Sequence, residues 1–132
     1  MMMNKIHILL VDDDERLRDL LCKFLVENDF FVSTARDASH ARQLMQAFIF
    51  DLMILDIMMP EMDGYEIARR LRQRPQLKDV WLIAFTGYGQ DSDRQRSKEA
   101  GFDHHLVKPV DPQKLEDLLA MLIKLPRSAK VN

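Results

Sequence analysis

Short apolar runs alternate with longer segments of helical period along the chain, and this alternation constrains the fold more than any other feature. The runs are too short for helices, and most are rich in branched or aromatic residues. They cover residues 6–11, 30–34, 52–55, 80–85 and 105–107. A strand that is covered on both faces reads as a continuous apolar run, so we expect a parallel sheet between two layers of helices.

A longer segment follows each of these runs. In four of the segments, apolar side chains recur at i, i+3, i+4 and i+7, which gives each helix one face to bury. The four stripes are Leu17, Leu20, Leu21, Phe24 and Leu25; Ala41, Leu44, Met45 and Phe48; Gly64, Ile67, Ala68 and Leu71; and Leu115, Leu118, Leu119 and Leu122. The remaining segment, residues 91–100, lacks such a stripe, so we expect it to be weakly held. The predicted fold class is α/β, a doubly wound (βα)5 sheet of five parallel strands.

Length and composition predict one soluble domain. The chain has 132 residues, of which 47% are apolar and 30% charged, a balance typical of globular proteins. We assign residues 1–125 to this domain and residues 126–132 to a short tail. Nineteen Lys and Arg against 21 Asp and Glu leave a net charge of -2, so direct binding of nucleic acid is not expected.

The same sequence indicates a reduced, cytoplasmic protein. No segment approaches the roughly 20 apolar residues that a membrane span needs, and residues 1–11 do not resemble a signal peptide. The single cysteine, Cys22, cannot form an internal disulfide. We therefore expect no membrane contact.

Ionisable and polar side chains stand directly after four of the predicted strands. They are Asp12, Asp13 and Asp14 after the first strand, Asp56 after the third, Thr86 after the fourth and Lys108 after the fifth. Ligands of an open parallel sheet bind outside the carboxyl ends of its strands, so we expect these groups to share one rim. Acidic residues also cap helices, which accounts for Asp14 and Glu15 without a role at the rim.

Crowded carboxylates repel one another unless a cation joins them. Because the candidate ligands all offer oxygen, Mg²⁺ is favoured, with Mn²⁺ as the alternative. Magnesium usually completes its shell with water and substrate phosphate, which points to phosphoryl transfer. Asp56 can then act as nucleophile and Lys108 can neutralise charge, while the Thr86 hydroxyl can donate a hydrogen bond to a phosphoryl oxygen.

Four segments together resemble the receiver domain of two-component response regulators. They read ILLVDD at 8–13, LDIMMPEMDG at 55–64, FTG at 85–87 and LVKP at 106–109. The resemblance covers residues 5–125, with the motifs in the family's order at the ends of four strands. It implies the strand order 2-1-3-4-5 and a cis peptide bond between Lys108 and Pro109.

The resemblance also assigns roles at the rim. It implies that Asp56 is the phosphoacceptor and that Thr86 and Lys108 act with it. The metal ligands that it implies are Asp13, Asp56 and the backbone carbonyl of Met58, with Asp12 acting through water. Thr86 and His105 are the implied switch residues, and His105 stands where many relatives carry Tyr or Phe.

A phosphoacceptor switch, and not an enzyme, is the function that this resemblance implies. The phosphoryl group would come from a histidine kinase or a histidine phosphotransfer protein, and its arrival would change the surface of the fourth helix and fifth strand. The downstream target is not indicated. A stand-alone regulator, a relay intermediate and a receiver cut from a larger kinase all fit these motifs. We expect a monomer before phosphorylation, because residues 91–98 and 113–124 lack the paired charges of dimerising receivers.

An aspartate-nucleophile phosphatase of haloacid-dehalogenase type is the alternative function. In that reading Asp12 is the nucleophile and Asp14 the acid. The class also needs an acidic pair late in the chain, and the carboxylates after Lys108 lie on or beside the last helix. They are Asp111, Glu116 and Asp117.

Two basic segments are interpreted as solvated helix faces, as charge runs on helices usually are. The first covers residues 69–74, and the second comprises Arg94, Arg96 and Lys98. Docking to an acidic partner is the alternative for both.

Overall fold

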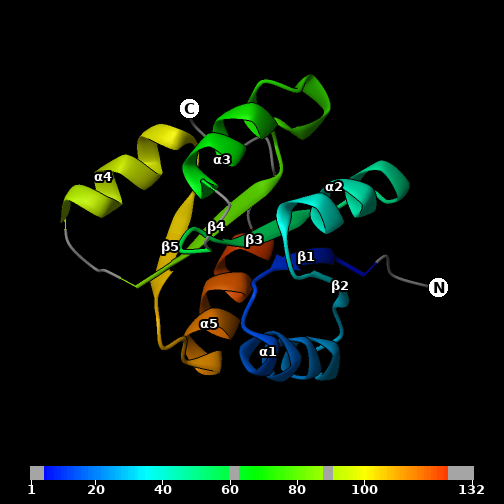
Figure 1. Cartoon of the computed structure of the whole chain (residues 1–132). Helices are drawn as coiled ribbons and strands as arrows, with labels where there is room; N and C mark the ends of the chain where they lie inside the picture. The colour runs from blue at the N-terminus through cyan, green and yellow to red at the C-terminus, as the bar shows by residue number, and fades with distance from the viewer. Residues whose placement is uncertain (1–4, 60–62, 88–90, 125–132) are drawn as a thin grey trace.

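The computed structural model describes residues 5–59, 63–87 and 91–124, with the backbone alone for 91–93. Five parallel strands form one sheet in the order β2-β1-β3-β4-β5 (Figure 1). The strands are β1 (His7–Val11), β2 (Phe31–Ala35), β3 (Leu52–Asp56), β4 (Trp81–Thr86) and β5 (His104–Val107). The predicted α/β class and strand order are confirmed, and only small shifts separate the predicted strand ends from the observed ones.

Helices cover both faces of the sheet (Figure 1). They are α1 (Glu15–Glu27), α2 (Ala38–Ala47), α3 (Gly64–Arg72), α4 (Asp91–Ala100) and α5 (Pro112–Ile123), with a short 3-10 helix, η1 (Pro75–Leu77). Aspartates begin four of the helices, because each side chain accepts a hydrogen bond from a backbone N–H of the first turn. These caps are Asp14, Asp37, Asp63 and Asp111. Neither the apolar runs nor the helical stripes predict η1, which begins at Pro75.

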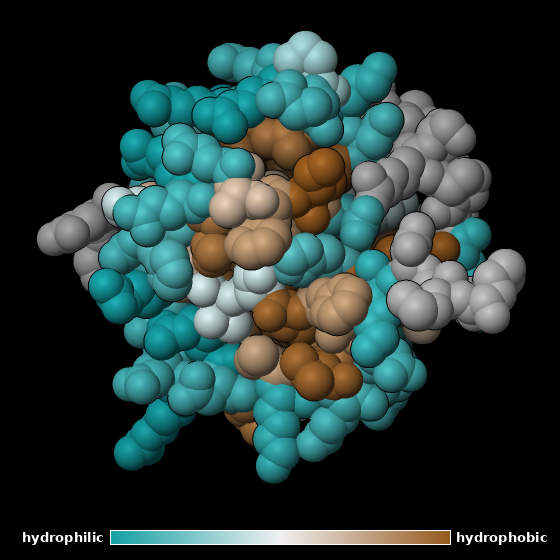
Figure 2. Space-filling model, turned by 90° about the vertical axis from the view of Figure 1, so that its right-hand side faces the viewer, coloured by the Kyte–Doolittle hydropathy of each residue, from teal (hydrophilic) through white to brown (hydrophobic). Residues whose placement is uncertain are grey.

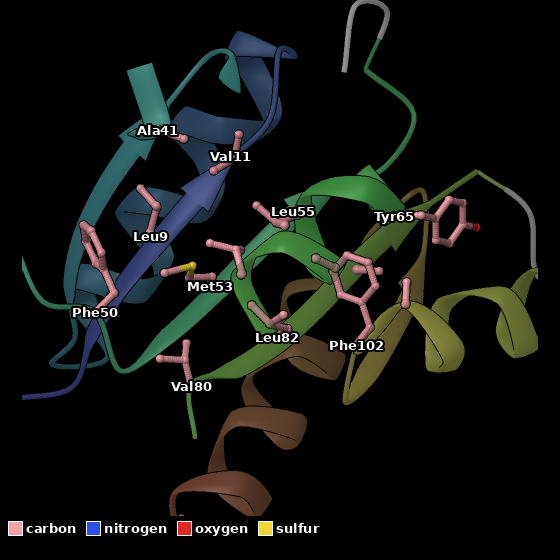
Figure 3. Packing of buried hydrophobic residues seen from close by; sticks show 14 of the residues in the cluster. Leu9, Val11, Ala41, Phe50, Met53, Leu55, Tyr65, Val80, Leu82 and Phe102 are labelled. Carbon is pink, nitrogen blue, oxygen red and sulfur yellow. The ribbon is translucent and has the colours of Figure 1, made fainter. Parts of the chain in front are cut away.

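The core consists of two clusters, one on each face of the sheet. Leu9 and Val11 of β1 belong to the cluster under α2 and α3, which Figure 3 shows from close by. Ile8 and Leu10 alternate with them and pack toward α1 and α5. Both faces of β1 are therefore buried, which explains why its sequence is a continuous apolar run.

The described part of α4 buries only small side chains. Ser97 and Ala100 are buried, whereas residues 94–96 and 98–99 are exposed. Gly101 follows with a φ of 109°, a backbone conformation that favours glycine and that commonly ends a helix. The small number of buried side chains agrees with the weak packing that the sequence predicts for this helix.

The interpretation of the basic segments as solvated faces is wrong for Arg72. Its side chain is 19% exposed, and its guanidinium donates to the Gly101 carbonyl at 2.9 Å and to the Asp103 carboxylate at 2.7 Å. In the second segment, the Arg96 guanidinium lies 4.4 Å from the centre of the Tyr65 ring, a cation–π contact. The sequence could not show these contacts because they join residues far apart in the chain.

Apolar surface remains at the amino ends of the strands. Phe31 begins β2, and Phe48 and Ile49 precede β3; all three are exposed, Ile49 to 87%. Figure 2 shows apolar patches on this side of the molecule, which faces right in Figure 1. Within the described residues, no helix is both long enough and apolar enough to cross a membrane. The predicted tail, residues 126–132, lies outside the described part of the chain.

Candidate functional site

Two neighbouring strands bring the central carboxylates together. Asp12 directly follows β1 and Asp56 ends β3, and these strands pair with Val11 opposite Leu55. Oxygens of Asp12, Asp13 and Asp56 all lie within 4.8 Å of one another. The predicted convergence of these carboxylates at the carboxyl edge of the sheet is therefore observed.

Lys108 reaches this cluster from the loop after β5. Its Nζ donates to Asp56 Oδ2 at 2.9 Å and to Asp12 Oδ1 at 3.3 Å, and it lies 3.1 Å from Asp12 Oδ2. Its backbone N–H donates to the Thr86 carbonyl at 2.7 Å, and the peptide bond to Pro109 is cis, as expected. Burial lowers the pKa of Lys108, but the hydrogen bonds to Asp56 and Asp12 outweigh it and raise that pKa overall. The ammonium is thus held charged between two carboxylates.

Burial shifts the pKa of the Asp12 carboxyl. It is fully buried, and burial is the main reason why its pKa is raised to about 6. The charge of Asp56 raises this pKa further, while the Asp14 N–H, which donates to Asp12 Oδ1 at 2.9 Å, lowers it. Among the described residues, Asp12 Oδ2 makes no hydrogen bond, although the Lys108 Nζ that donates to Asp12 Oδ1 lies 3.1 Å from it. Asp13, by contrast, is exposed.

Asp56 is buried with both oxygens held. Oδ1 accepts the Met58 N–H at 2.8 Å, and Oδ2 accepts from Lys108. Gly64 lies close to the residue that follows Asp56, since a Cβ on Gly64 would lie 2.8 Å from the Ile57 Cα. Only glycine fits there without a backbone shift, so the start of α3 is fixed against the residue after Asp56.

The two expected switch residues lie on the neighbouring strands. Thr86 is buried at the end of β4, one residue beyond Phe85, the register partner of Asp56. His105 pairs with Ala84 on the other side of β4 and is half-buried. Burial is the main reason why the pKa of His105 is lowered, and the positive charge of Arg94 lowers it further. The switching role of both residues stays a prediction.

Comparison with known proteins identifies the family. Residues 8–120 match the response regulator receiver domain. The chain belongs to the response regulator receiver family. PetR of Rhodobacter capsulatus is 44% identical over 109 residues, which are 83% of this chain and 45% of PetR. SrrA of Staphylococcus aureus, a transcriptional regulatory protein, is 32% identical over 125 residues, 95% of this chain and 51% of SrrA. The chain therefore spans about half the length of these two relatives.

Solved receiver structures share the fold. The chemotaxis protein CheY4 of Vibrio cholerae matches with a TM-score of 0.84 and 30% identity, over 89% of this chain and 98% of CheY4. The receiver domain of a signal transduction histidine kinase from Syntrophus aciditrophicus matches with a TM-score of 0.80 and 30% identity, over 95% and 97% of the two chains. This receiver therefore resembles both a chemotaxis protein and a kinase-attached receiver.

The donor set of the receiver fits a hard divalent cation. All three clustered side chains are carboxylates, and oxygen ligands are those that Mg²⁺ and Mn²⁺ prefer. The buried Asp12 Oδ2, without a hydrogen bond among the described residues, is an acceptor that a cation or its water would satisfy. The residues present are therefore compatible with such an ion.

One supporting residue was missed from the sequence. Arg18 of α1 donates from Nη1 to the Asp12 carbonyl at 2.8 Å, which ties the first helix to the backbone of the cluster. The sequence could have indicated this role, because Arg18 stands four residues after the capping Asp14. It therefore lies near the end of the helix that faces the rim. Asp14, the acid of the phosphatase alternative, accepts the Leu17 N–H at 3.2 Å as the cap of α1.

Proposed function

We propose that this receiver accepts a phosphoryl group on Asp56, with the help of a divalent cation, from a phosphohistidine of a histidine kinase or a histidine phosphotransfer protein. The observation that carries the proposal is the setting of Asp56. It is a buried carboxylate beside Asp12 and Asp13, and Lys108 Nζ lies 2.9 Å from its Oδ2. Burying a carboxylate costs free energy unless a partner compensates its charge. Such groups occur preferentially at functional sites.

In the proposed reaction, a carboxylate oxygen of Asp56 attacks the phosphorus of phosphohistidine. The new oxygen–phosphorus bond forms as the phosphorus–nitrogen bond breaks, and the electron pair stays on the imidazole nitrogen, which takes up a proton. Lys108 stabilises negative charge on the transferred oxygens. Asp13, Asp56 and the Met58 carbonyl, with Asp12 through water, would hold Mg²⁺ or Mn²⁺, which would supply further positive charge. The Met58 N–H keeps Asp56 oriented.

The phosphoryl group then acts through Thr86 and His105. The new charge draws the Thr86 hydroxyl toward a phosphoryl oxygen, because charge-assisted hydrogen bonds are the strongest available there. The movement of Thr86 frees space beside β4, His105 turns inward and α4 shifts, which changes the surface of α4 and β5. We propose that the protein works in the cytoplasm as a signalling switch, not an enzyme with its own substrate, and is a monomer before phosphorylation.

Intact-mass spectrometry with acetyl phosphate as donor tests this proposal. We expect one phosphoryl adduct when Mg²⁺ or Mn²⁺ is present and none in excess chelator, and the adduct is expected to break down in mild alkali as acyl phosphates do. Asp56→Asn removes the nucleophile while keeping the side-chain shape, so it abolishes the adduct. An adduct that survives Asp56→Asn, or that forms equally well with chelator, overturns the assignment.

A further inference from the structure

A cavity lies between α2 and α3, on the face of the sheet opposite α1 and α5. Its volume is about 230 Å³. Leu9 and Val11 of β1 and Met53 and Leu55 of β3 line it from the sheet, and Figure 3 shows these side chains among the core residues of that face. The cavity is therefore apolar on its inner side.

The two helices contact different neighbours. Helix α2 packs against β1 and β2, whereas α3 packs against α4 and η1 as well as against the core cluster of this face. Ala38 and Ala41 of α2 line the cavity, and their short side chains leave space between the helix and the sheet. Met45 of α2 and Ile67 of α3 form part of its walls.

Three arginines surround the apolar lining. Arg42 lies on α2, Arg70 on α3 and Arg74 just after α3, and all three are exposed. Arg70 pairs with Glu66 at 3.1 Å, whereas Arg42 and Arg74 form no ion pair with any described residue. No carboxylate is among the described residues that line the cavity. An apolar space bordered by uncompensated guanidinium groups attracts an anion with an apolar body.

We propose that this cavity binds a small organic acid, with its hydrocarbon part against the sheet and its carboxylate at Arg42 and Arg74. An apolar cavity of about 150 Å³ holds benzene, and pockets for drug-sized ligands range from about 300 to 1,000 Å³. The volume of about 230 Å³ therefore fits one aromatic ring or a short hydrocarbon chain. Guanidinium groups match the planar geometry of a carboxylate.

The cavity borders the strands that carry the carboxylate cluster. Val11 and Leu55 line it and directly precede Asp12 and Asp56, so a bound acid contacts the strand ends that position both carboxylates. The cavity shares no lining residue with the cluster itself. The inference therefore stands independently of the proposed phosphoryl transfer.

Titration with sodium octanoate, followed by NMR of ¹³C-labelled methionine methyl groups, tests this site. Met45 and Met53 line the cavity, whereas the exposed Met121 lies on α5 and serves as an internal reference. We expect saturable shifts at Met45 and Met53 and none at Met121. Octanol, which keeps the chain without the charge, and acetate, which keeps the charge without the chain, are expected to bind much more weakly.

Charge-removing variants locate the carboxylate. The double variant Arg42→Gln, Arg74→Gln is expected to raise the Kd for octanoate about fivefold or more, since each exposed charge contact contributes up to about 1 kcal/mol. Arg16→Gln with Lys23→Gln removes the same charge from exposed positions of α1 and is the matched control. All four positions are exposed, so both variants are expected to fold.

Three results overturn the proposal. One is an octanoate response spread over all methionines without saturation. Another is octanol binding as tightly as octanoate. The third is a Kd for the arginine double variant within about twofold of the control, which would mean that the guanidinium groups contribute less than about 0.4 kcal/mol.

Discussion

At the scale of single residues, Asp12 shows how the receiver gives up stability at its functional site. Its pKa is raised from 3.8 to about 6, chiefly by burial and further by the charge of Asp56. The folded protein therefore holds a proton on Asp12 more tightly than the unfolded chain does. Stability from this group is complete below pH 3.8 and is lost as the pH rises through 6, since the charged form must then be buried.

Asp12→Asn is accordingly expected to stabilise the protein at pH 7.5 in the absence of divalent cations. The gain is about 1–3 kcal/mol in the free energy of unfolding, from the size of the pKa shift, and it shrinks toward zero near pH 4. The amide oxygen can still accept the Asp14 N–H. Urea unfolding at both pH values measures the difference. Asp13→Asn changes an exposed carboxylate and is the control, for which we expect a smaller gain in the free energy of unfolding. If Asp12→Asn is less stable than the unsubstituted protein at pH 7.5, burial of the Asp12 charge does not lower stability.

At the scale of elements, α4 is the part that the fold leaves easiest to move. Its described side chains bury only Ser97 and Ala100, so a shift of the helix costs few buried contacts. Its C-terminal end is held in place, because Arg72 Nε donates a hydrogen bond to the carbonyl of Gly101, the residue that follows the helix. We therefore expect phosphorylation to move the rest of the helix about this end.

Amide hydrogen exchange with and without a beryllofluoride mimic at Asp56 measures that movement. We expect altered exchange in α4 and β5, with a modest coupling of about 1–3 kcal/mol, because it passes through one hydroxyl, one ring and a loosely packed helix. Thr86→Ala is expected to remove the response while the mimic still binds. Unchanged exchange in α4 and β5 with the mimic bound, or a full response in Thr86→Ala, contradicts the mechanism.

Arg72 fixes several elements to one another, and its loss is expected to be costly. Its guanidinium donates to the carbonyls of Gly101 and Val80, at 2.9 and 2.7 Å, and to Asp103 at 2.7 Å. Arg72→Ala is expected to reduce the free energy of unfolding by about 2–3 kcal/mol, because it leaves a mostly buried carboxylate and several carbonyls with fewer donors. Urea unfolding tests this, with Arg69→Ala as control. A loss no larger than that of the control contradicts the assigned role.

At the scale of the whole molecule, the alternation of apolar runs and helical stripes was enough to predict the layers of the fold. The rim was predictable because Asp12, Asp56 and Thr86 stand at strand ends, where topology alone decides which groups meet. The strand order came from the family resemblance, not from periodicity. The contacts of Arg72 were not predictable, because its partners lie up to 31 residues away. The cavity between α2 and α3 was not predictable either, because residues far apart in the chain, from Leu9 to Arg74, line it together.

Mapping the phosphorylated residue shows directly whether Asp56 accepts the phosphoryl group. After reaction with acetyl phosphate and Mg²⁺, borohydride reduces an aspartyl phosphate to homoserine, and peptide mass spectrometry then locates the change. We predict homoserine at position 56 alone, in the peptide that contains β3. Homoserine at position 12 would contradict it and would favour the phosphatase alternative with Asp12 as nucleophile.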